Sequence, residues 1–331
     1  MENDKVLDVK NLTAAFSIRK KEYEVLHDIS FSVRRNETLC VVGESGCGKS
    51  VTTLCIMQLL PKNGHITGGE IILDGTDLTK LSKKDIVKFR GKKMGMIFQE
   101  PMTALNPLLT IGFQMKEMIK LHRGVDNKEA ERIAVEYLKK VGIANPESRL
   151  KQYTFELSGG LRQRVMIAMM LSARPDLLIA DEPTTALDVT IQRQVLNLLN
   201  DLKKDMNAGI LFITHDLGVV SEIADRIVVL YAGRKVEEGT TEQIFNDPRH
   251  PYTIGLMKAV PDVDSDEYNI EPIPGTFPNI TEEIPGCRFS PRCPYAGSCK
   301  LCTTEAPEGV EVEEGHFVAC HLALRKESPN E

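Results

Sequence analysis

The sequence has no apolar run close to the roughly 20 residues that a membrane-spanning helix requires. Its first ten residues, MENDKVLDVK, are charged and lack the apolar centre of a signal peptide. Basic residues are not in excess either, because 41 Lys and Arg stand against 47 Asp and Glu. Nucleic-acid binders usually carry a basic face. We therefore expect a soluble protein that does not bind nucleic acid and that reaches a membrane only through a partner.

The middle of the chain also contains no cysteine. Three cysteines lie early, and five others are crowded near the end: Cys287, Cys293, Cys299, Cys302 and Cys320. In the cytosol, which we expect for a chain without an export signal, clustered cysteines indicate a metal site rather than disulfides. The early residues Cys40 and Cys55 are interpreted as small buried apolar residues.

What the sequence does contain is an alternation of strand and helix patterns, which predicts an α/β fold. Apolar runs predict strands at 29–33, 38–42, 70–73, 94–98, 177–180, 209–214 and 226–230, and periodicity predicts helices over 51–60, 128–141, 161–172 and 189–204. Strand patterns are missing between Phe98 and Arg174, which indicates an inserted helical subdomain at about 100–175. After Pro261 the sequence becomes rich in proline, glycine and cysteine. We predict a main domain over 1–260 and a small cysteine-rich extension over 261–331.

A glycine-rich segment follows the predicted strand that ends at Val42. Its sequence is Gly43, Glu44, Ser45, Gly46, Cys47, Gly48, Lys49 and Ser50, with Val51 opening the next helix. This matches the P-loop, whose backbone N–H groups and helix N-terminus bind phosphate oxygens. Lys49 is predicted to reach the β- and γ-phosphates of ATP, and the Ser50 hydroxyl to ligate Mg²⁺.

A second motif, which is acidic, also indicates nucleotide hydrolysis. The apolar strand Leu177–Ala180 ends in the carboxylates Asp181 and Glu182. Asp181 suits a role in holding the waters of Mg²⁺. Glu182 is predicted to be the general base for the attacking water. Taken alone, this segment could also be a strand that ends in a solvated acidic turn.

Further motifs resemble the ABC ATPases, a family of P-loop NTPases with a RecA-like core. Leu157–Arg164 (LSGGLRQR) is similar to the signature motif of that family. Ala186–Asp188 resembles the D-loop, which implies a nucleotide-binding role for Asp188. Gln99 resembles the Q-loop glutamine, and His215 resembles the switch histidine. The resemblance covers about residues 5–255 and implies catalytic roles for Gln99, His215 and Glu182, with Gln99 also near Mg²⁺.

The resemblance implies a head-to-tail dimer in which Ser158, Gly159 and Gly160 close over the ATP of the other subunit. These residues precede a helix, so they suit anion binding in their own right. Phe16 lies where the family stacks an aromatic ring on adenine, although a single aromatic residue can equally belong to the core. Leu161 departs from the usual glutamine of the signature, and we expect activity to survive.

The segment Gln99–Gly112, the stretch Arg249–Thr253 (RHPYT) and Gly286–Pro294 (GCRFSPRCP) resemble the oligopeptide, dipeptide and nickel importers. Within that group, the segments SGGLRQRVMIA and DEPTTALD are similar to those of the D-type subunit. This implies an F-type ATPase subunit, or a second copy, as dimer partner. It also implies two membrane permease subunits, an extracytoplasmic solute-binding protein and a location on the cytoplasmic face of the membrane. The expected function is ATP-driven uptake of di- or oligopeptides, with nickel import as the alternative.

The cysteine-rich end leaves two interpretations open. The family resemblance implies a [4Fe–4S] cluster held by Cys287, Cys293, either Cys299 or Cys302, and Cys320. A zinc site, which His316 or His321 could join, is the alternative. A soluble ABC ATPase acting on ribosomes or DNA is a further alternative for the whole chain. Such proteins usually carry two ATPase domains or a long insertion. An exporter subunit would not be expected to carry the importer-like tail.

Overall fold

The computed structural model describes residues 4–100, 104–185, 187–259 and 272–323. The chain forms two compact units, each assembled from separate segments. One contains Met1–Leu7, Ser32–Thr38 and Leu73–Ile213, and the other contains Asp8–Phe31, Leu39–Ile72 and Thr214–Glu331. The cysteine-rich end of the chain therefore belongs to the same unit as the P-loop segment.

Three neighbouring parallel strands lie in the first unit. They are β6 (Met94–Ile97), β7 (Leu177–Asp181) and β8 (Gly209–Ile213), and β7 pairs with both of the others. Every residue of these strands is buried, as expected for parallel strands covered on both faces. The three predicted strands in this region are confirmed to within one residue at their ends.

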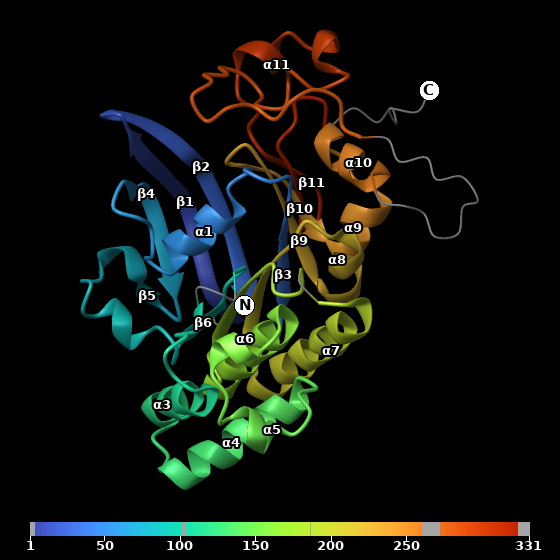
Figure 1. The fold of residues 1–331 in the computed structure, drawn as a ribbon. Helices are drawn as coiled ribbons and strands as arrows, with labels where there is room; N and C mark the ends of the chain where they lie inside the picture. The colour runs from blue at the N-terminus through green and yellow to red at the C-terminus, as the bar shows by residue number, and fades with distance from the viewer. Residues whose placement is uncertain (1–3, 101–103, 186, 260–271, 324–331) are drawn as a thin grey trace. The chain divides into compact units, whose positions relative to one another are not determined.

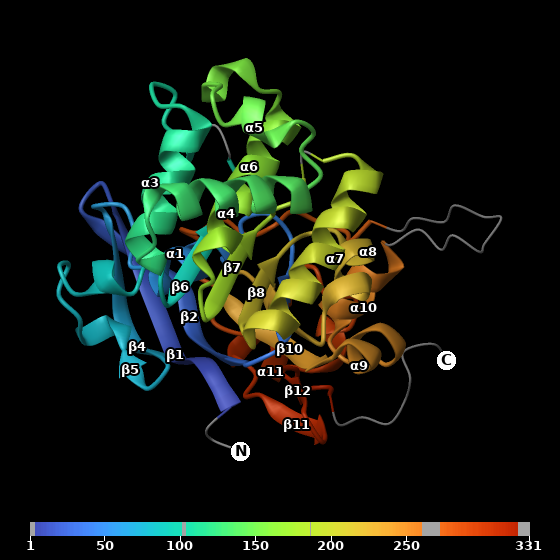
Figure 2. The same ribbon diagram turned by 90° about the horizontal axis from the view of Figure 1, so that it is seen from below.

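Helices make up most of the rest of the first unit. They are α3 (Ile111–Arg123), α4 (Asn127–Lys140), α5 (Pro146–Arg149), α6 (Gly159–Ala173) and α7 (Val189–Met206). Helices α3, α4 and α6 contact one another, and they lie together in Figure 2. Thr110, Asp126 and Ser158 each cap one of these three helices by accepting a hydrogen bond from the backbone N–H three residues later. The predicted helices are present, and α3 was not among them.

A second group of strands lies in the other unit. Both β3 (Thr38–Val42) and β9 (Arg226–Tyr231) were predicted as strands, and they pair in parallel. Beyond β9 the pairing becomes antiparallel, in the order β9, β10 (Arg234–Thr240), β12 (His316–Val318) and β11 (Val310–Glu313). Figure 1 shows β9 and β10 side by side, with the red C-terminal segments next to them. The end of the chain thus extends this group of strands.

Most of three longer strands also belongs to the second unit. They are β1 (Lys5–Ile18), β2 (Lys21–Arg34) and β4 (Gly64–Leu73), adjacent in the order β2, β1, β4, while the short β5 (Thr76–Asp77) belongs to the first unit. The sequence did not predict β1. Its alternation is broken at Asn11, which has a left-handed φ of 50° and whose backbone N–H donates to the Ser30 hydroxyl.

The helices of the second unit are short: α1 (Lys49–Ile56), α8 (Leu217–Ile223), α9 (Thr241–Asn246), α10 (Pro251–Lys258) and α11 (Leu301–Thr304). Helix α1 follows the P-loop and ends before the predicted Leu60. The reason is local, because Gln58 adopts a left-handed φ of 52° and Pro61 follows.

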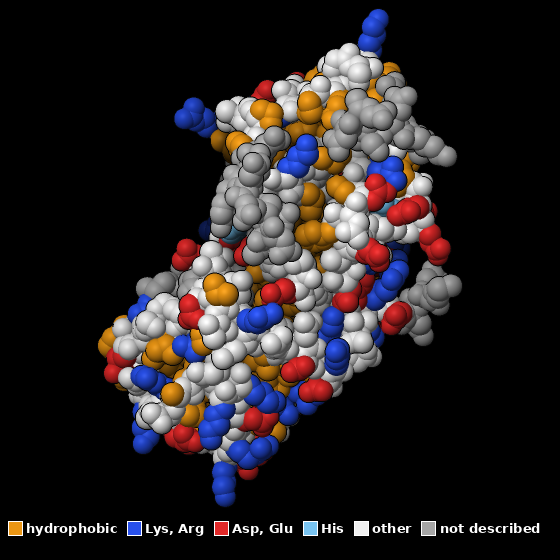
Figure 3. All heavy atoms as spheres, turned by 90° about the vertical axis from the view of Figure 1, so that its right-hand side faces the viewer, with side chains coloured by type: hydrophobic (Ala, Val, Ile, Leu, Met, Phe, Trp, Pro, Cys, Tyr) orange, Lys and Arg blue, Asp and Glu red, His pale blue; other side chains and the backbone are white. Residues whose placement is uncertain are grey.

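Within the part of the chain that the structure describes, no helix combines the length and the hydrophobicity needed to cross a membrane. Acidic and basic side chains are interspersed on the face drawn in Figure 3. This agrees with the nearly balanced composition of the sequence.

Candidate functional site

The glycine-rich loop between β3 and α1 is held in a conformation that only glycine adopts easily. Gly43 and Gly48 have φ values of 148° and 109°. A Cβ atom on Gly43 would lie 2.3 Å from the carbonyl oxygen of Leu230, and one on Gly48 would lie 2.7 Å from Cδ2 of Leu26. The loop therefore packs closely against its neighbours, and its shape depends on these two glycines.

Lys49 points back into this loop. Its side chain is buried, and Nζ donates to the carbonyl oxygens of Gly43 (2.6 Å) and Glu44 (3.1 Å). Ser45, Gly46 and Ser50 are exposed. The free face of the loop thus carries backbone groups and small polar side chains, while the ammonium group lies within the loop. Such an arrangement suits the binding of a phosphate chain.

Cys47 and Val51 complete the predicted P-loop set. The Cys47 thiol is buried, and this burial raises its pKa. The thiol therefore stays protonated near neutral pH and is a poor nucleophile. Val51, half-buried, lies in the first turn of α1.

Two more predicted residues belong to the same unit as the P-loop. Phe16 is half-buried on β1, and its ring comes within 3.0 Å of where a Cβ on Gly64 would lie. One side of the ring is therefore covered by the backbone at Gly64. His215 is exposed and directly precedes Asp216, which caps α8.

The predicted catalytic carboxylates lie at the end of β7 in the first unit. Asp181 is buried as the last residue of the strand. Glu182 adopts a left-handed φ of 47°, and its backbone N–H donates to the carbonyl oxygen of Ile213 at 2.9 Å. Its carboxylate accepts a hydrogen bond from the Gln99 side-chain amide at 2.9 Å. The structure thus brings Gln99 and Glu182 together, and strained backbone of this kind is common at functional sites.

The signature-like segment opens helix α6 in the first unit. The Ser158 hydroxyl accepts from the N–H of Leu161 at 3.4 Å, which leaves its own proton available as a donor. Gly159 is exposed and Gly160 is half-buried. The buried Gln163 amide of α6 donates to the carbonyl oxygen of Pro183, so this helix is tied to the turn that follows Glu182.

Asp188 caps helix α7 by accepting from the N–H of Ile191 at 3.0 Å. Ala186, in the same predicted D-loop, lies outside the described residues, as do residues 101–103 after Gln99.

The ligand atoms predicted for Mg²⁺ are all oxygen atoms, which this hard cation prefers. Ser50 and Gln99 are exposed, and the buried Asp181 suits an outer role through water. The chemistry of these side chains therefore fits the metal. Ser50 belongs to one unit, and Gln99 and Asp181 belong to the other.

The late cysteines lie near one another. The N–H of Cys287 donates to the carbonyl oxygen of Cys302 (2.9 Å), and the N–H of Cys302 donates to that of Cys299 (3.1 Å). Burial raises the pKa of the Cys302 thiol to about 12, helped by its hydrogen bond with Cys299 and by the charges of Cys287 and Cys320. In the described ranges, however, no three Cys, His, Asp or Glu side chains are arranged to hold a metal ion.

The two histidines considered for zinc have other partners. His316 is fully buried, and its Nε2 lies 2.8 Å from a carboxylate oxygen of Glu237. His321 Nε2 lies 2.9 Å from the carbonyl oxygen of Glu305. Neither contact favours a zinc site.

Tyr252 and Arg292 have no role predicted from the sequence, yet both contact the P-loop. The Tyr252 hydroxyl accepts from the N–H of Glu44 at 2.8 Å. The Arg292 guanidinium makes two hydrogen bonds to the Glu44 carboxylate, at 2.8 and 3.1 Å. A signal was present, since these residues lie in the RHPYT and FSPRC stretches whose resemblance to the importers had no catalytic explanation.

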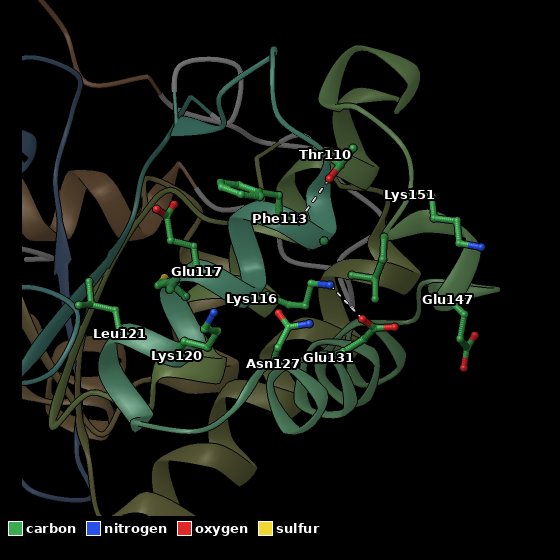
Figure 4. Close-up of a pocket in the computed structure, with 13 residues that line it drawn as sticks. Thr110, Phe113, Lys116, Glu117, Lys120, Leu121, Asn127, Glu131, Glu147 and Lys151 are labelled. Atoms are coloured by element: carbon green, nitrogen blue, oxygen red, sulfur yellow. Dashed lines mark hydrogen bonds and ion pairs between the residues drawn. The ribbon is translucent and has the colours of Figure 1, made fainter.

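The first unit also contains a surface groove. It runs along helices α3, α4 and α5, and Figure 4 shows an ion pair between Lys116 and Glu131 across it, with an N–O distance of 2.9 Å. Phe113 and Leu121 are exposed along its wall. The groove contains none of the predicted nucleotide-site residues.

The glycine-rich loop with its buried lysine, and the strand that ends in a hydrogen-bonded carboxylate, define a P-loop ATPase. Two family models match the chain: "ABC transporter" over residues 26–185 and "Oligopeptide/dipeptide transporter, C-terminal region" over residues 236–299. The chain belongs to the ABC transporter family and, within it, to the oligopeptide/dipeptide transport ATP-binding proteins.

Individual proteins agree with this assignment. The chain is 47% identical to the oligopeptide transport ATP-binding protein OppD of Bacillus subtilis, covering 98% of this chain and 90% of that one. It is 46% identical to OppD of Haemophilus influenzae, covering 97% and 98%. Among solved structures, it resembles the dimeric ATP-binding cassette MJ0796 bound to ADP and Pi, with a TM-score of 0.65, 28% identity, and coverage of 71% of this chain and 98% of that one. The chain therefore has the ABC ATPase cassette fold and is an ATPase.

Proposed function

We propose that this protein hydrolyses ATP to drive the uptake of di- or oligopeptides through a membrane permease. The observation that carries the proposal is the hydrogen bond between the Gln99 amide and the Glu182 carboxylate, because it orients a candidate base at the end of β7. The names of OppD and its relatives support peptide as the solute over nickel. The rate of ATP turnover of the Glu182→Gln variant tests the role of this carboxylate.

Each predicted residue has a distinct task in this mechanism. The P-loop backbone and Lys49 bind the phosphates, and Phe16 stacks on the adenine. Ser50, Gln99 and, through water, Asp181 would hold Mg²⁺, which would neutralise charge on the phosphates. Glu182 accepts the proton of the attacking water, and His215 stabilises the γ-phosphate. Asp188, which caps α7, contributes to nucleotide binding from the D-loop.

We further propose that the protein works as a head-to-tail dimer, with an F-type ATPase subunit as its partner in the cell. The exposed Ser158 and Gly159 at the start of α6 support this, because they offer a second anion-binding helix end in one chain. The dimer would dock peripherally on two permease subunits at the cytoplasmic face of the membrane. An extracytoplasmic solute-binding protein would deliver the peptide.

Nucleotide should control this dimer. We expect Glu182→Gln protein to be mainly monomeric without nucleotide and dimeric with MgATP, because the signature residues complete the site of the other subunit. Size-exclusion chromatography with light scattering measures both states. Adding Ser158→Arg should keep the protein monomeric, since a bulky cation replaces the hydroxyl, whereas the exposed Lys128→Arg on α4 is a control that should still dimerise. Dimers that form equally without nucleotide would contradict this mechanism.

We also propose that residues 261–331 form an extension that holds a [4Fe–4S] cluster on Cys287, Cys293, Cys320 and one of Cys299 and Cys302, within a chain whose ATPase domain spans 1–260. The backbone contacts among Cys287, Cys299 and Cys302 support the proposal. Soft thiolate ligands suit such a cluster. Zinc is the alternative, and the hydrogen bonds of His316 and His321 weigh against their participation.

Iron content tests the cluster. We expect anaerobically purified protein to be brown, with about four irons per chain, and to lose its colour in air. Cys287→Ser, Cys293→Ser and Cys320→Ser should each remove the colour, whereas only one of Cys299→Ser and Cys302→Ser should do so. Cys55→Ala removes a thiol outside this region and should stay brown. Colourless anaerobic protein with one zinc per chain would contradict the cluster.

A further inference from the structure

Glu44 places a negative charge within a loop that binds phosphates. Its side chain is 32% exposed, and its backbone lies between Gly43 and the exposed Ser45. A carboxylate at such a position repels the triphosphate through Coulomb forces unless another group neutralises it. The P-loop motif itself contains no group assigned to neutralise this carboxylate, so a residue from elsewhere in the chain must do so.

Arg292 supplies the opposite charge. Its Nη1 and Nη2 donate to the two carboxylate oxygens of Glu44 at 2.8 and 3.1 Å, a two-pronged geometry that favours arginine over lysine. The Arg292 side chain is only 4% exposed. The hydrogen bond to Glu44 raises the pKa of Arg292, so the guanidinium stays charged.

The guanidinium is held in place by the same terminal segment. Its Nε donates to the carbonyl oxygen of Pro274 at 2.9 Å, and Nη2 also reaches the carbonyl oxygen of Ile273 at 3.3 Å. A Cβ atom on Gly275, whose φ is 80°, would lie 3.1 Å from Cγ of Arg292. Residues 273–275 thus form a tight support for the side chain.

A cluster of aromatic rings also packs beside the contact between Arg292 and Glu44. The rings of Tyr252, Phe277 and Phe289 all pack on Tyr231, at centroid distances of 4.6 to 5.1 Å. Tyr252 accepts from the Glu44 N–H, and Phe277 lies 3.8 Å from where a Cβ on Gly46 would be. The RHPYT stretch and the terminal segment therefore meet at one residue of the P-loop.

We infer that Arg292 is a positioning residue of the nucleotide site, which neutralises Glu44 and fixes the P-loop in a shape ready for the triphosphate of ATP. The terminal segment thereby acts on nucleotide affinity. The inference rests on the ATP-binding role of the P-loop, and it adds a residue from more than 240 positions later in the chain.

The test is the affinity of the full chain for MgATP, measured by equilibrium calorimetry. Arg292→Ala leaves the Glu44 charge unneutralised and should weaken binding about tenfold or more. Arg292→Lys, which keeps the charge but loses the paired geometry, should fall between the wild type and Arg292→Ala. Arg288→Ala removes a charge from the same turn without a contact to Glu44, and its affinity should be unchanged.

A double variant separates neutralisation from simple packing. Arg292→Ala with Glu44→Gln removes both charges and should recover most of the lost affinity, to within about threefold of the wild type. Glu44→Gln alone should bind MgATP at least as tightly as the wild type. This measurement tests the inference even if Arg292→Ala folds poorly. Unrescued binding in the double variant, or a tenfold loss in Glu44→Gln, would overturn the inference. Wild-type protein that bound no MgATP would instead overturn the nucleotide site itself.

Discussion

Replacing Glu182 by glutamine should lower ATP turnover by about 10²–10⁴-fold while leaving MgATP binding intact. The amide retains the size of the side chain and can still hydrogen-bond Gln99, but it cannot accept the proton of the attacking water. Steady-state phosphate release and equilibrium ATP binding, measured on the same preparation, give the two quantities.

Two other variants define what this result means. Glu147→Gln changes an exposed glutamate of the same unit and should hydrolyse ATP at the wild-type rate. Lys49→Ala removes the ammonium group from the P-loop and should weaken nucleotide binding itself. If Glu182→Gln kept near wild-type turnover, Glu182 would not be the base.

The strands and turns that carry the predicted nucleotide-site residues could be identified because each motif is local in sequence. Lys49 and Glu182 each lie in a short motif that combines a buried strand with the turn after it, and β3 and β7 are those strands. The contact between Gln99 and Glu182 joins residues 83 positions apart. Family resemblance indicated a shared site for these residues, whereas their hydrogen bond required coordinates.

The contacts of the terminal segment were not predictable from local pattern. Arg292 lies in a stretch rich in proline and cysteine, without the periodicity that indicates a helix or strand. Its partner Glu44 is 248 residues away. Charge complementarity between two residues at such a separation has no signature in a single sequence, since many other acidic residues could serve equally well.

Strand β10 shows a different limit of the sequence. Its centre contains Glu237 and Glu238, a pair that usually indicates a solvated surface, and no strand was predicted there. Both side chains are nevertheless buried. Glu238 is paired with Arg226 and Lys235. Since the partners of Glu237 come from two other parts of the chain, only the folded structure accounts for its burial.

Glu237 is fully buried and connects three elements. Its carboxylate accepts hydrogen bonds from the backbone N–H groups of Arg249 (2.7 Å) and His250 (2.9 Å), just before α10. It also contacts His316 Nε2 on β12 at 2.8 Å. The residue therefore joins β10 to the RHPYT stretch and to the terminal strands, and its removal should loosen all three.

We expect Glu237→Ala to lower the free energy of unfolding of the second unit by about 3–5 kcal/mol, because the variant leaves buried donors and a buried histidine without their partner. Urea denaturation followed by circular dichroism measures this change. Glu313→Ala is the matched control: Glu313 also lies near His316, at 3.5 Å, but its side chain is 50% exposed. Its loss should cost less than about 1 kcal/mol.

The pH dependence of stability provides a separate test of the pair formed by Glu237 and His316. Burial acts to lower the pKa of His316, but the hydrogen bond and the charge of Glu237, together with Glu313, raise it overall above its ordinary value of 6.5. A raised folded-state pKa contributes stability that is complete below pH 6.5 and is lost as the pH rises through the folded value. Wild-type protein should therefore lose stability over that range, and Glu237→Ala should lose less, since its histidine is no longer held protonated by this carboxylate. Equal pH slopes in the two proteins, or a stability change below 1 kcal/mol in Glu237→Ala, would show that the buried pair does not stabilise the terminal strands.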